Sequence, residues 1–289
     1  MKFAFVFPGQ GSQSVGMMAG YGVAAPVRET FAEAADALGQ DLWIMASDGP
    51  ADLLNQTVNT QPVMLAAGVA AYRLWQSRGG PAPALMAGHS LGEYGALVCA
   101  NAIGFDDAVK LVRLRAEAMQ SAVPEGVGAM AAVLGLDDAA VRAVCAEAAQ
   151  GEILEAVNFN SPGQVVIAGH RAAVDRGCAL AKEKGAKRAL PLPVSVPSHC
   201  ALMKPAAEKL LAALAGIEVK SPVVPVLHNA DVAGHADPAA IREALARAGR
   251  QNMEGIDAMV IGTSAGAMPL GARACRLSNP ANTSRASAS

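Results

Sequence analysis

Short apolar runs alternate with helical periodicity in the first hundred residues of the chain. Residues 3–7 form an unbroken apolar run that ends abruptly at turn residues, which is typical of a buried strand. Helical patterns follow at residues 27–38 and 61–78, and a second apolar run occupies residues 84–87. Strands that alternate with helices in this way predict an α/β sheet.

Residues 127–193 follow a different order of elements. The pattern predicts strands at residues 127–134, 153–160, 165–168 and 188–192, and helices at residues 137–150 and 171–184. The order β-α-β-β-α-β is the ferredoxin-like arrangement. We interpret this segment as a small domain inserted into the larger α/β domain, which resumes near Ser195. One continuous sheet is the alternative.

The composition indicates a folded chain without a strong net field. Of the 289 residues, 52% are hydrophobic and 17% charged, which excludes disorder except in the serine-rich residues 278–289. The net charge of −2 provides no field to attract nucleic acid or an anionic membrane. No apolar run approaches the roughly 20 residues that span a bilayer, and the first run is too short for a signal peptide. We therefore expect no nucleic-acid or membrane partner and a cytoplasmic location.

The five cysteines are odd in number, widely scattered and never in a C-x-x-C pair. This spacing argues against both a disulfide framework and a zinc site. We expect reduced thiols that pack in the interior, and no metal site.

One serine lies in the pattern G-x-S-x-G between an apolar run and a helical stretch. In residues 88–92 glycines flank Ser90, so that the backbone can turn sharply and leave the hydroxyl exposed at a helix amino terminus. The free amides and the helix dipole at that terminus favour a developing oxyanion. Ser90 is therefore a candidate nucleophile. An ordinary glycine-rich turn between strand and helix is the alternative.

A second match to the same pattern surrounds Ser264 and resembles the elbow of patatin-like hydrolases. Those enzymes use a serine–aspartate dyad, so a partner acid should follow Ser264 in the chain. The only acidic residues after Glu243 are Glu254 and Asp257, and both precede the serine. Ser264 is therefore the weaker candidate.

A serine hydroxyl needs a base to accept its proton, and five histidines are available. His199 lies where the chain would leave the inserted domain, at a boundary where an active-site cleft is expected. His89 adjoins the serine, but neighbouring side chains diverge, so packing or substrate contact suits it better. His170 begins a predicted helix, while His228 and His235 lie in a polar loop and are predicted to be at the surface. His199 is the candidate base, with a structural histidine as the alternative.

Arg115 lies on the apolar face of a helix predicted at residues 106–121. That face also carries Ala108, Val112 and Met119, whereas the solvated face carries Asp106, Lys110, Arg113 and Glu117. A buried arginine needs a partner, and its planar fork suits bidentate capture of a carboxylate. An internal ion pair with Asp or Glu is the alternative.

A basic cluster ends the last helix predicted for the small domain. We interpret it as a solvated helix end, with a docking patch for an acidic partner as the alternative. The cluster consists of Lys182, Lys184, Lys187 and Arg188.

Several separated motifs occur in one order along the chain. They are FPGQGSQ at residues 7–13, TQP at 60–62, GHSLGE at 88–93, Arg115, NFNSPGQ at 158–164 and VPSH at 196–199. With these motifs, the chain resembles the malonyl-CoA:acyl carrier protein transacylase family from residue 1 to about residue 247. Such an ordered set is far more specific than any one of its motifs.

The resemblance implies a fold of the α/β class. We expect an α/β-hydrolase-like large domain at residues 1–126 and 195–289, of which residues 248–289 are atypical. The inserted ferredoxin-like small domain is expected at residues 127–194, in agreement with the order of the predicted elements.

The resemblance also implies a two-step acyl transfer in fatty acid synthesis. Ser90 would attack malonyl-CoA with His199 as base, and acyl carrier protein would take the malonyl group from the serine through its phosphopantetheine thiol. Arg115 would hold the free malonyl carboxylate, and no metal or redox cofactor would be required. Three further positions complete the implied site: the backbone amides of Gln10 and Leu91 as the oxyanion hole, and Gln61 in the lining.

From about residue 248 the sequence departs from the family pattern. Family members continue with an Arg-Gln pair, an aromatic-proline stretch that helps to orient the histidine, and a Gly-Pro-Gly turn. None of these is present, and Arg250-Gln251 is only a displaced echo. If His199 lacks the orientation that the missing segment normally provides, activation of the serine should weaken. Two alternative functions stay open. One is a serine esterase or thioesterase that uses the same pair with water as acceptor, and the other, because of the altered C-terminus, is a catalytically impaired remnant that still binds carrier protein.

Overall fold

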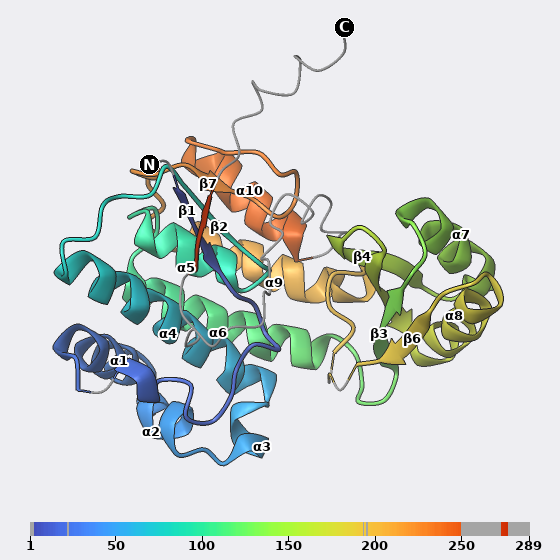
Figure 1. Cartoon of the computed structure of the whole chain (residues 1–289), viewed down its shortest axis with the longest axis horizontal. Helices are drawn as coiled ribbons and strands as arrows, with labels where there is room; N and C mark the ends of the chain where they lie inside the picture. The colour runs from blue at the N-terminus through green and yellow to red at the C-terminus, as the bar shows by residue number, and fades with distance from the viewer. Residues whose placement is uncertain (1–2, 22, 193, 195, 250–272, 277–289) are drawn as a thin grey trace, which may run out of the picture.

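The computed structural model describes residues 3–21, 23–192, 194, 196–249 and 273–276. Its helices and strands form two lobes, each built around its own sheet (Figure 1). The rival serine, Ser264, and the predicted tail at residues 278–289 lie outside the described residues.

The sheet of the large lobe has the strand order β7-β2-β1-β8. Its strands are β1 (Phe3–Phe7), β2 (Leu85–Gly88), β7 (Val226–Leu227) and β8 (Arg273–Arg276). β1 and β2 run parallel, β2 pairs in parallel with β7, and β8 is antiparallel to β1. Because carboxyl ends of parallel strands meet at one edge, the loops after β1, β2 and β7 come together.

Helices surround this sheet and bury a continuous core with it. They are α1 (Ala25–Leu38), α2 (Leu42–Ser47), α3 (Ala51–Leu54), α4 (Thr57–Ser77), α5 (Gly92–Cys99), α6 (Phe105–Ala122), α9 (Lys204–Ala215) and α10 (Pro238–Ala248), with 3-10 turns at Ala19–Tyr21 and Ala201–Met203. Phe5, Met86 and Leu97 lie in that core. Among the described helices, none has both the length and the apolar character needed to cross a membrane.

The small lobe contains a second sheet with the strand order β4-β5-β3-β6. Its elements are β3 (Gly128–Leu134), α7 (Asp138–Ala149), β4 (Leu154–Ser161), β5 (Gln164–His170), α8 (Arg171–Glu183) and β6 (Arg188–Pro191). Every pairing in this sheet is antiparallel. The predicted α/β class with a ferredoxin-like part is confirmed, while the domain limits 1–126, 127–194 and 195–289 stay a prediction.

The two faces of the small sheet have different neighbours. One face, with Val133 and Ile167, packs against α7 and α8. The other face forms a cluster of Met130, Val157 and Cys200, the last of which belongs to the segment that returns to the large lobe. This returning segment therefore runs between the small sheet and the large lobe, and it carries the candidate base.

The four thiols that the structure describes are all buried and unpaired. They belong to Cys99, Cys145, Cys178 and Cys200. Burial raises the pKa of each, which keeps these thiols protonated at neutral pH. Their packing agrees with the expectation from the cysteine spacing.

Candidate active site

Ser90 lies on the sharp turn between β2 and α5, in the left-handed backbone region with a φ of 50°. Two glycines make this turn possible. A Cβ atom on Gly88 would lie 1.9 Å from the carbonyl carbon of Gly92, and one on Gly92 would lie 2.2 Å from the carbonyl oxygen of Phe7. The turn is therefore packed against the end of β1 and presents Ser90 beside the amino terminus of α5.

His199 contacts the hydroxyl of Ser90 although it lies 109 positions later in the chain. Its Nε2 lies 2.9 Å from Oγ, and its Nδ1 lies 2.9 Å from the backbone oxygen of Ala248 at the end of α10. Because a carbonyl only accepts, Nδ1 carries the hydrogen and Nε2 is the acceptor for the serine proton. His199 therefore keeps an orienting carbonyl even though the sequence departs from the family pattern. The carbonyl comes from the point where the sequence begins to depart from the family.

The imidazole of His199 is held in its neutral form. The side chain is buried, and burial lowers its pKa from 6.5 to about 3, with a further lowering by the positive charge of Arg115. The hydrogen bond to the carbonyl of Ala248 opposes this shift without reversing it. At neutral pH the ring is therefore free to accept a proton.

Arg115 on α6 is buried and reaches the same hydroxyl. Its Nη2 donates to Oγ of Ser90 over 3.0 Å, and its Nη1 donates to Oε1 of Gln61 over 2.7 Å. No carboxylate in the described part of the chain pairs with this guanidinium, so the alternative of an internal ion pair finds no support there. A buried cation without a counter-ion offers a carboxylate ligand a strong partner.

Two backbone amides beside the serine have no acceptor among the described residues. They belong to Gln10, in the loop after β1, and to Leu91, which follows Ser90. Both residues line a cavity of 110 Å³ together with Ser90 and His199. Unpaired amides next to a nucleophile are the groups from which an oxyanion hole is built.

The cavity over Ser90 lies between the two lobes. Ser90 and Arg115 line it from the large lobe, and Met130 and Asn158 line it from the small sheet. The Oδ1 atom of Asn158 is buried without a hydrogen-bond partner in the described chain, which leaves one acceptor for a ligand. Gln61 does not line this cavity. It is fully buried, and it contacts two residues of the lining: its Oε1 accepts from the guanidinium of Arg115, and its Nε2 donates to Sδ of Met119 over 3.6 Å.

Two of the other histidines take part in packing. Nε2 of His89 lies 3.2 Å from Oδ1 of Asn160, a contact between the two lobes. Nδ1 of His170 accepts a hydrogen bond from the backbone amide of Ile153 over 3.0 Å. Neither ring contacts Ser90, in agreement with the preference for His199.

The prediction that His228 lies at the surface is wrong. Its ring is fully buried, and Nδ1 donates to the carboxylate of Glu93 over 2.7 Å, whereas His235 is half-buried. The adjacent Asn229 is also buried and accepts a hydrogen bond from the amide of Ser90. Reasoning from sequence missed these contacts because a polar loop carries no signal of burial. Of the residues in these contacts, only Glu93 had a signal in the sequence, as the last residue of the GHSLGE motif.

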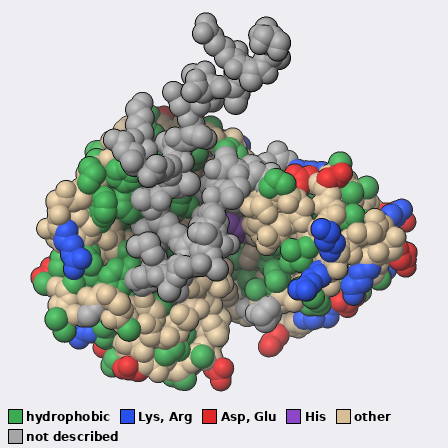
Figure 2. Space-filling view, viewed as in Figure 1, with side chains coloured by type: hydrophobic (Ala, Val, Ile, Leu, Met, Phe, Trp, Pro, Cys, Tyr) green, Lys and Arg blue, Asp and Glu red, His purple; other side chains and the backbone are tan. Residues whose placement is uncertain are grey.

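The predicted basic cluster is exposed at the end of α8 and the start of β6. Its members are Lys182, Lys184, Lys187 and Arg188. Figure 2 shows that Lys and Arg side chains gather on the small lobe in this view. Nζ of Lys184 lies 3.4 Å from the carboxylate of Glu147, which partly offsets the positive charge. A role for the cluster in docking stays a prediction.

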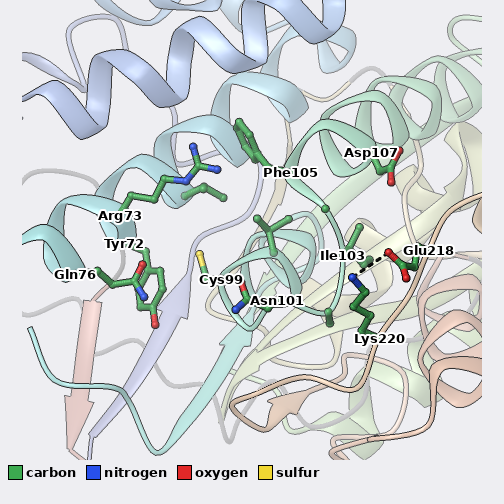
Figure 3. Close-up of a pocket in the computed structure, with 14 residues that line it drawn as sticks. Tyr72, Arg73, Gln76, Cys99, Asn101, Ile103, Phe105, Asp107, Glu218 and Lys220 are labelled. Carbon is green, nitrogen blue, oxygen red and sulfur yellow. Dashed lines mark ion pairs between the residues drawn. The ribbon is translucent and has the colours of Figure 1, made fainter.

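A larger cavity of 490 Å³ lies away from Ser90 (Figure 3). Tyr72 of α4, Cys99 of α5 and an ion pair of Glu218 with Lys220 line it. None of the predicted site residues belongs to this lining. No group of three or more His, Cys, Asp or Glu side chains suited to a metal occurs in the described residues.

Comparison with known proteins gives consistent matches. The acyl transferase domain family matches residues 4–254. The chain is 63% identical over 247 residues to the malonyl CoA-acyl carrier protein transacylase of Escherichia coli, covering 85% of this chain and 80% of that protein. It is also similar to the crystal structure of an acyl-carrier-protein S-malonyltransferase from Burkholderia pseudomallei. The TM-score is 0.88 at 61% identity, and the match covers 89% of this chain and 84% of that one. Another solved structure holds a type II PKS acyl-carrier protein in complex with its malonyl-transacylase. There the TM-score is 0.86 at 57% identity, and the match covers 88% of this chain and 82% of that one.

Proposed function

This chain belongs to the acyl transferase domain family, and on that ground we propose that it moves a malonyl group from malonyl-CoA to the phosphopantetheine thiol of acyl carrier protein in fatty acid synthesis. One observation carries the proposal. Oγ of Ser90 contacts both Nε2 of His199, at 2.9 Å, and Nη2 of Arg115, at 3.0 Å. A base and a carboxylate-binding cation on one hydroxyl are the groups that malonyl transfer requires.

The first half of the reaction forms an ester on Ser90. Its Oγ attacks the thioester carbonyl carbon while Nε2 of His199 takes the hydroxyl proton. The carbon–sulfur bond then breaks, and His199 returns the proton to the coenzyme A thiolate. The unpaired amides of Gln10 and Leu91 support an oxyanion hole for the tetrahedral intermediate.

The second half of the reaction runs the same chemistry in reverse. The carrier-protein thiol gives its proton to Nε2 of His199 and attacks the ester carbonyl, and Oγ of Ser90 leaves and regains a proton. The single imidazole acts as base and acid in turn because its other nitrogen is fixed on the carbonyl of Ala248. Covalent transfer suits a site that must release one thiol before it admits another.

Arg115 supplies the selection for malonyl. The donor's free carboxylate is the counter-ion that the buried guanidinium lacks, whereas an acetyl group leaves that charge unpaired. Binding of the carboxylate also offsets the positive charge that lowers the pKa of His199. Malonyl therefore improves its own transfer by making the base stronger.

Ser90, His199 and Arg115 together provide the nucleophile, the base and the charge for every step. We accordingly propose a reaction that uses no metal or redox cofactor. A cytoplasmic location also stays a prediction, and cell fractionation with an antibody to the chain would test it.

One contact in the site distinguishes each of the two alternative functions from this proposal. A serine esterase or thioesterase would use the same dyad with water as acceptor, and it would have no use for a buried guanidinium aimed at Oγ. An impaired remnant would have lost the orientation of His199, which the carbonyl of Ala248 supports here. These contacts favour the transferase.

Intact-mass measurement after brief exposure to malonyl-CoA tests the proposed function. We expect the full chain to gain the mass of one malonyl group, and Ser90→Ala to gain none. Subsequent addition of acyl carrier protein bearing phosphopantetheine should remove the adduct and load the carrier. Folded protein without an adduct would instead favour the remnant.

Arg115→Ala separates the transferase from an esterase. We expect the preference of the unchanged protein for malonyl-CoA over acetyl-CoA to fall by about 100-fold or more, because a charge-assisted bidentate contact is lost. An esterase would show no such change, since it has no carboxylate to select.

A further inference from the structure

The turn that follows β7 contacts the backbone of Ser90. In it Asn229 is 1% exposed, and its Oδ1 accepts a hydrogen bond from the backbone amide of Ser90 over 2.9 Å. Its Nδ2 donates to the carbonyl oxygen of Gly88 over 2.8 Å. One side chain therefore holds the two consecutive peptide groups that lead into Ser90, where the backbone is in the strained left-handed region.

Glu93 fixes the orientation of this amide. Its carboxylate is 1% exposed, and its Oε2 accepts from the backbone amide of Asn229 over 3.2 Å and from Nδ2 of the same residue. Its Oε1 accepts from Nδ1 of His228. Because a carboxylate only accepts, Nδ2 must face Glu93 and Oδ1 must face Ser90.

The same turn reaches the base by a second route. Oδ2 of Asp231 accepts a hydrogen bond from Nη2 of Arg247 over 2.6 Å. Arg247 directly precedes Ala248, whose carbonyl oxygen accepts from Nδ1 of His199. The ion pair thus ties the last turn of α10 to the loop that supports Ser90.

We propose that Asn229 and Asp231 are positioning residues for acyl transfer, the first holding Ser90 in its attacking conformation and the second, through Arg247, holding the carbonyl that orients His199. Neither residue lines the cavity over Ser90, so each acts on the chemical step and leaves donor binding unchanged. A role in stability alone would leave the rate per folded molecule unchanged. The inference rests on the proposed function, because it needs the malonyl-Ser90 adduct as its readout.

The rate of adduct formation on the full chain tests Asn229. Quenched single-turnover reactions with malonyl-CoA, read by intact mass, should show a rate about 100-fold lower for Asn229→Ala, with the half-saturating donor concentration unchanged. Asn59→Ala is the matched control. It truncates another buried asparagine of the large lobe, whose Nδ2 donates to the backbone oxygen of Leu53 over 2.9 Å, and should keep the rate.

Asn229→Asp provides a signature that loss of stability would not give. It places a second carboxyl group beside Glu93, and the two cannot both be ionised at this distance without mutual repulsion. Protonation restores a donor toward Glu93 and leaves an acceptor for the amide of Ser90. The deficit in rate relative to the unchanged protein should therefore shrink as the pH is lowered.

Asp231→Asn tests the second route at an exposed residue, where we expect the variant to fold. We expect about a tenfold lower rate of adduct formation, since the charge that holds Arg247 is lost. Asp237→Asn is the matched control. Asp237 caps the amino terminus of α10, at the opposite end from Arg247, and asparagine is an equally good cap.

No adduct on the unchanged protein would refute the proposed function itself. A normal adduct rate in Asn229→Asp and Asp231→Asn, or a change confined to the half-saturating concentration, would overturn the positioning roles.

Discussion

At the scale of single residues, the neutral state of His199 determines the pH range of the reaction. Burial, with the charge of Arg115, lowers the pKa of its ring to about 3. The pH dependence of kcat/KM reports the ionisation of the free protein. We therefore expect kcat/KM for malonyl-CoA to stay level from about pH 8 to about pH 5, whereas an ordinary histidine would cause a fall below about pH 6.5.

Arg115→Gln is the control for this profile. It removes the positive charge that lowers the pKa of His199, so the fall of kcat/KM at acid pH should move to higher pH. Acetyl-CoA serves as donor here, because it does not need the guanidinium. A fall in kcat/KM centred near the usual histidine pKa in the unchanged protein would contradict the expectation.

Gln61 keeps Arg115 available for a ligand because its amide is uncharged. In Gln61→Glu a buried carboxylate would pair with the guanidinium at the place where Oε1 of Gln61 accepts now. We expect the KM for malonyl-CoA to rise by about 10- to 100-fold, since the donor must compete with an internal counter-ion. Steady-state kinetics with malonyl-CoA would measure the change.

Gln40→Glu is the matched control for Gln61→Glu. Gln40 accepts a hydrogen bond from Arg113, on the same helix α6, but outside the cavity over Ser90. The same change of amide to carboxylate beside an arginine should leave the KM unchanged there. Equal effects of the two substitutions would show that charge alone, and not competition at Arg115, is responsible.

At the scale of elements, the turn between β2 and α5 depends on glycine at two positions. In Gly88→Ala or Gly92→Ala the new Cβ would meet backbone atoms, which cannot move aside as a flexible side chain can. We expect a loss of about 3 kcal/mol or more in the free energy of unfolding, or no folded protein. Urea unfolding curves would give the value.

Gly216→Ala provides the comparison for these glycines. Gly216 follows α9 with an ordinary φ of −89°, and a Cβ there would come no closer than 3.4 Å to the backbone oxygen of Ala213. We expect a change within about 1 kcal/mol. A similarly small change at Gly88 or Gly92 would contradict the close packing of the elbow.

Some of these elements can be predicted from sequence because their limits carry strong local signals. β1 and the six elements of the small lobe are apolar or periodic stretches bounded by turn residues, and the predicted ranges lie within a few residues of the observed ones. β7 has two residues, too few for any periodicity to be visible. α2 and α3 are likewise too short for a helical pattern to stand out.

The same contrast holds for the candidate site. G-x-S-x-G predicts the turn at Ser90, and helical spacing places Arg115 on a buried face. The support under the turn cannot be predicted, because Asn229 contacts Ser90 across 139 positions of sequence and looks like an ordinary loop residue. The carbonyl of Ala248 leaves no trace in sequence at all, since every residue type carries one. The catalytic roles of the predicted residues stay predictions.

At the scale of the whole molecule, the candidate site depends on both lobes. The large lobe provides Ser90 and Arg115, the small sheet provides Asn158, and His199 lies on the segment between them. His89 and Asn160 form a further contact from lobe to lobe. A change in the spacing of the lobes would therefore change the cavity and the dyad together.

The buried neutral histidine also makes the folded molecule sensitive to acid. In the unfolded chain His199 has a pKa near 6.5, so between that value and about 3 the unfolded state binds a proton that the folded state does not. His199 alone should therefore lower the free energy of unfolding by up to about 1.4 kcal/mol per pH unit as the pH drops below 6.5. Urea unfolding at several pH values would measure this slope.

His199→Gln removes the titrating group and serves as the reference. We expect the stability that the unchanged protein loses between pH 6.5 and 5, relative to this variant, to be about 2 kcal/mol. Burial also lowers the pKa of His89, which adds a loss in the same direction to both proteins. Parallel curves for the two proteins would mean that His199 does not stay neutral when buried.

The acceptor for Nδ1 of His199 is a peptide group at the end of α10, and this has an evolutionary consequence. Point mutations at position 248 change a side chain and leave that oxygen where it is. Insertion or deletion of one residue within α10 would instead displace it by about 1.5 Å along the axis and about 100° around it. The gene should therefore tolerate missense changes at this codon and not tolerate changes in the length of the helix that precedes it.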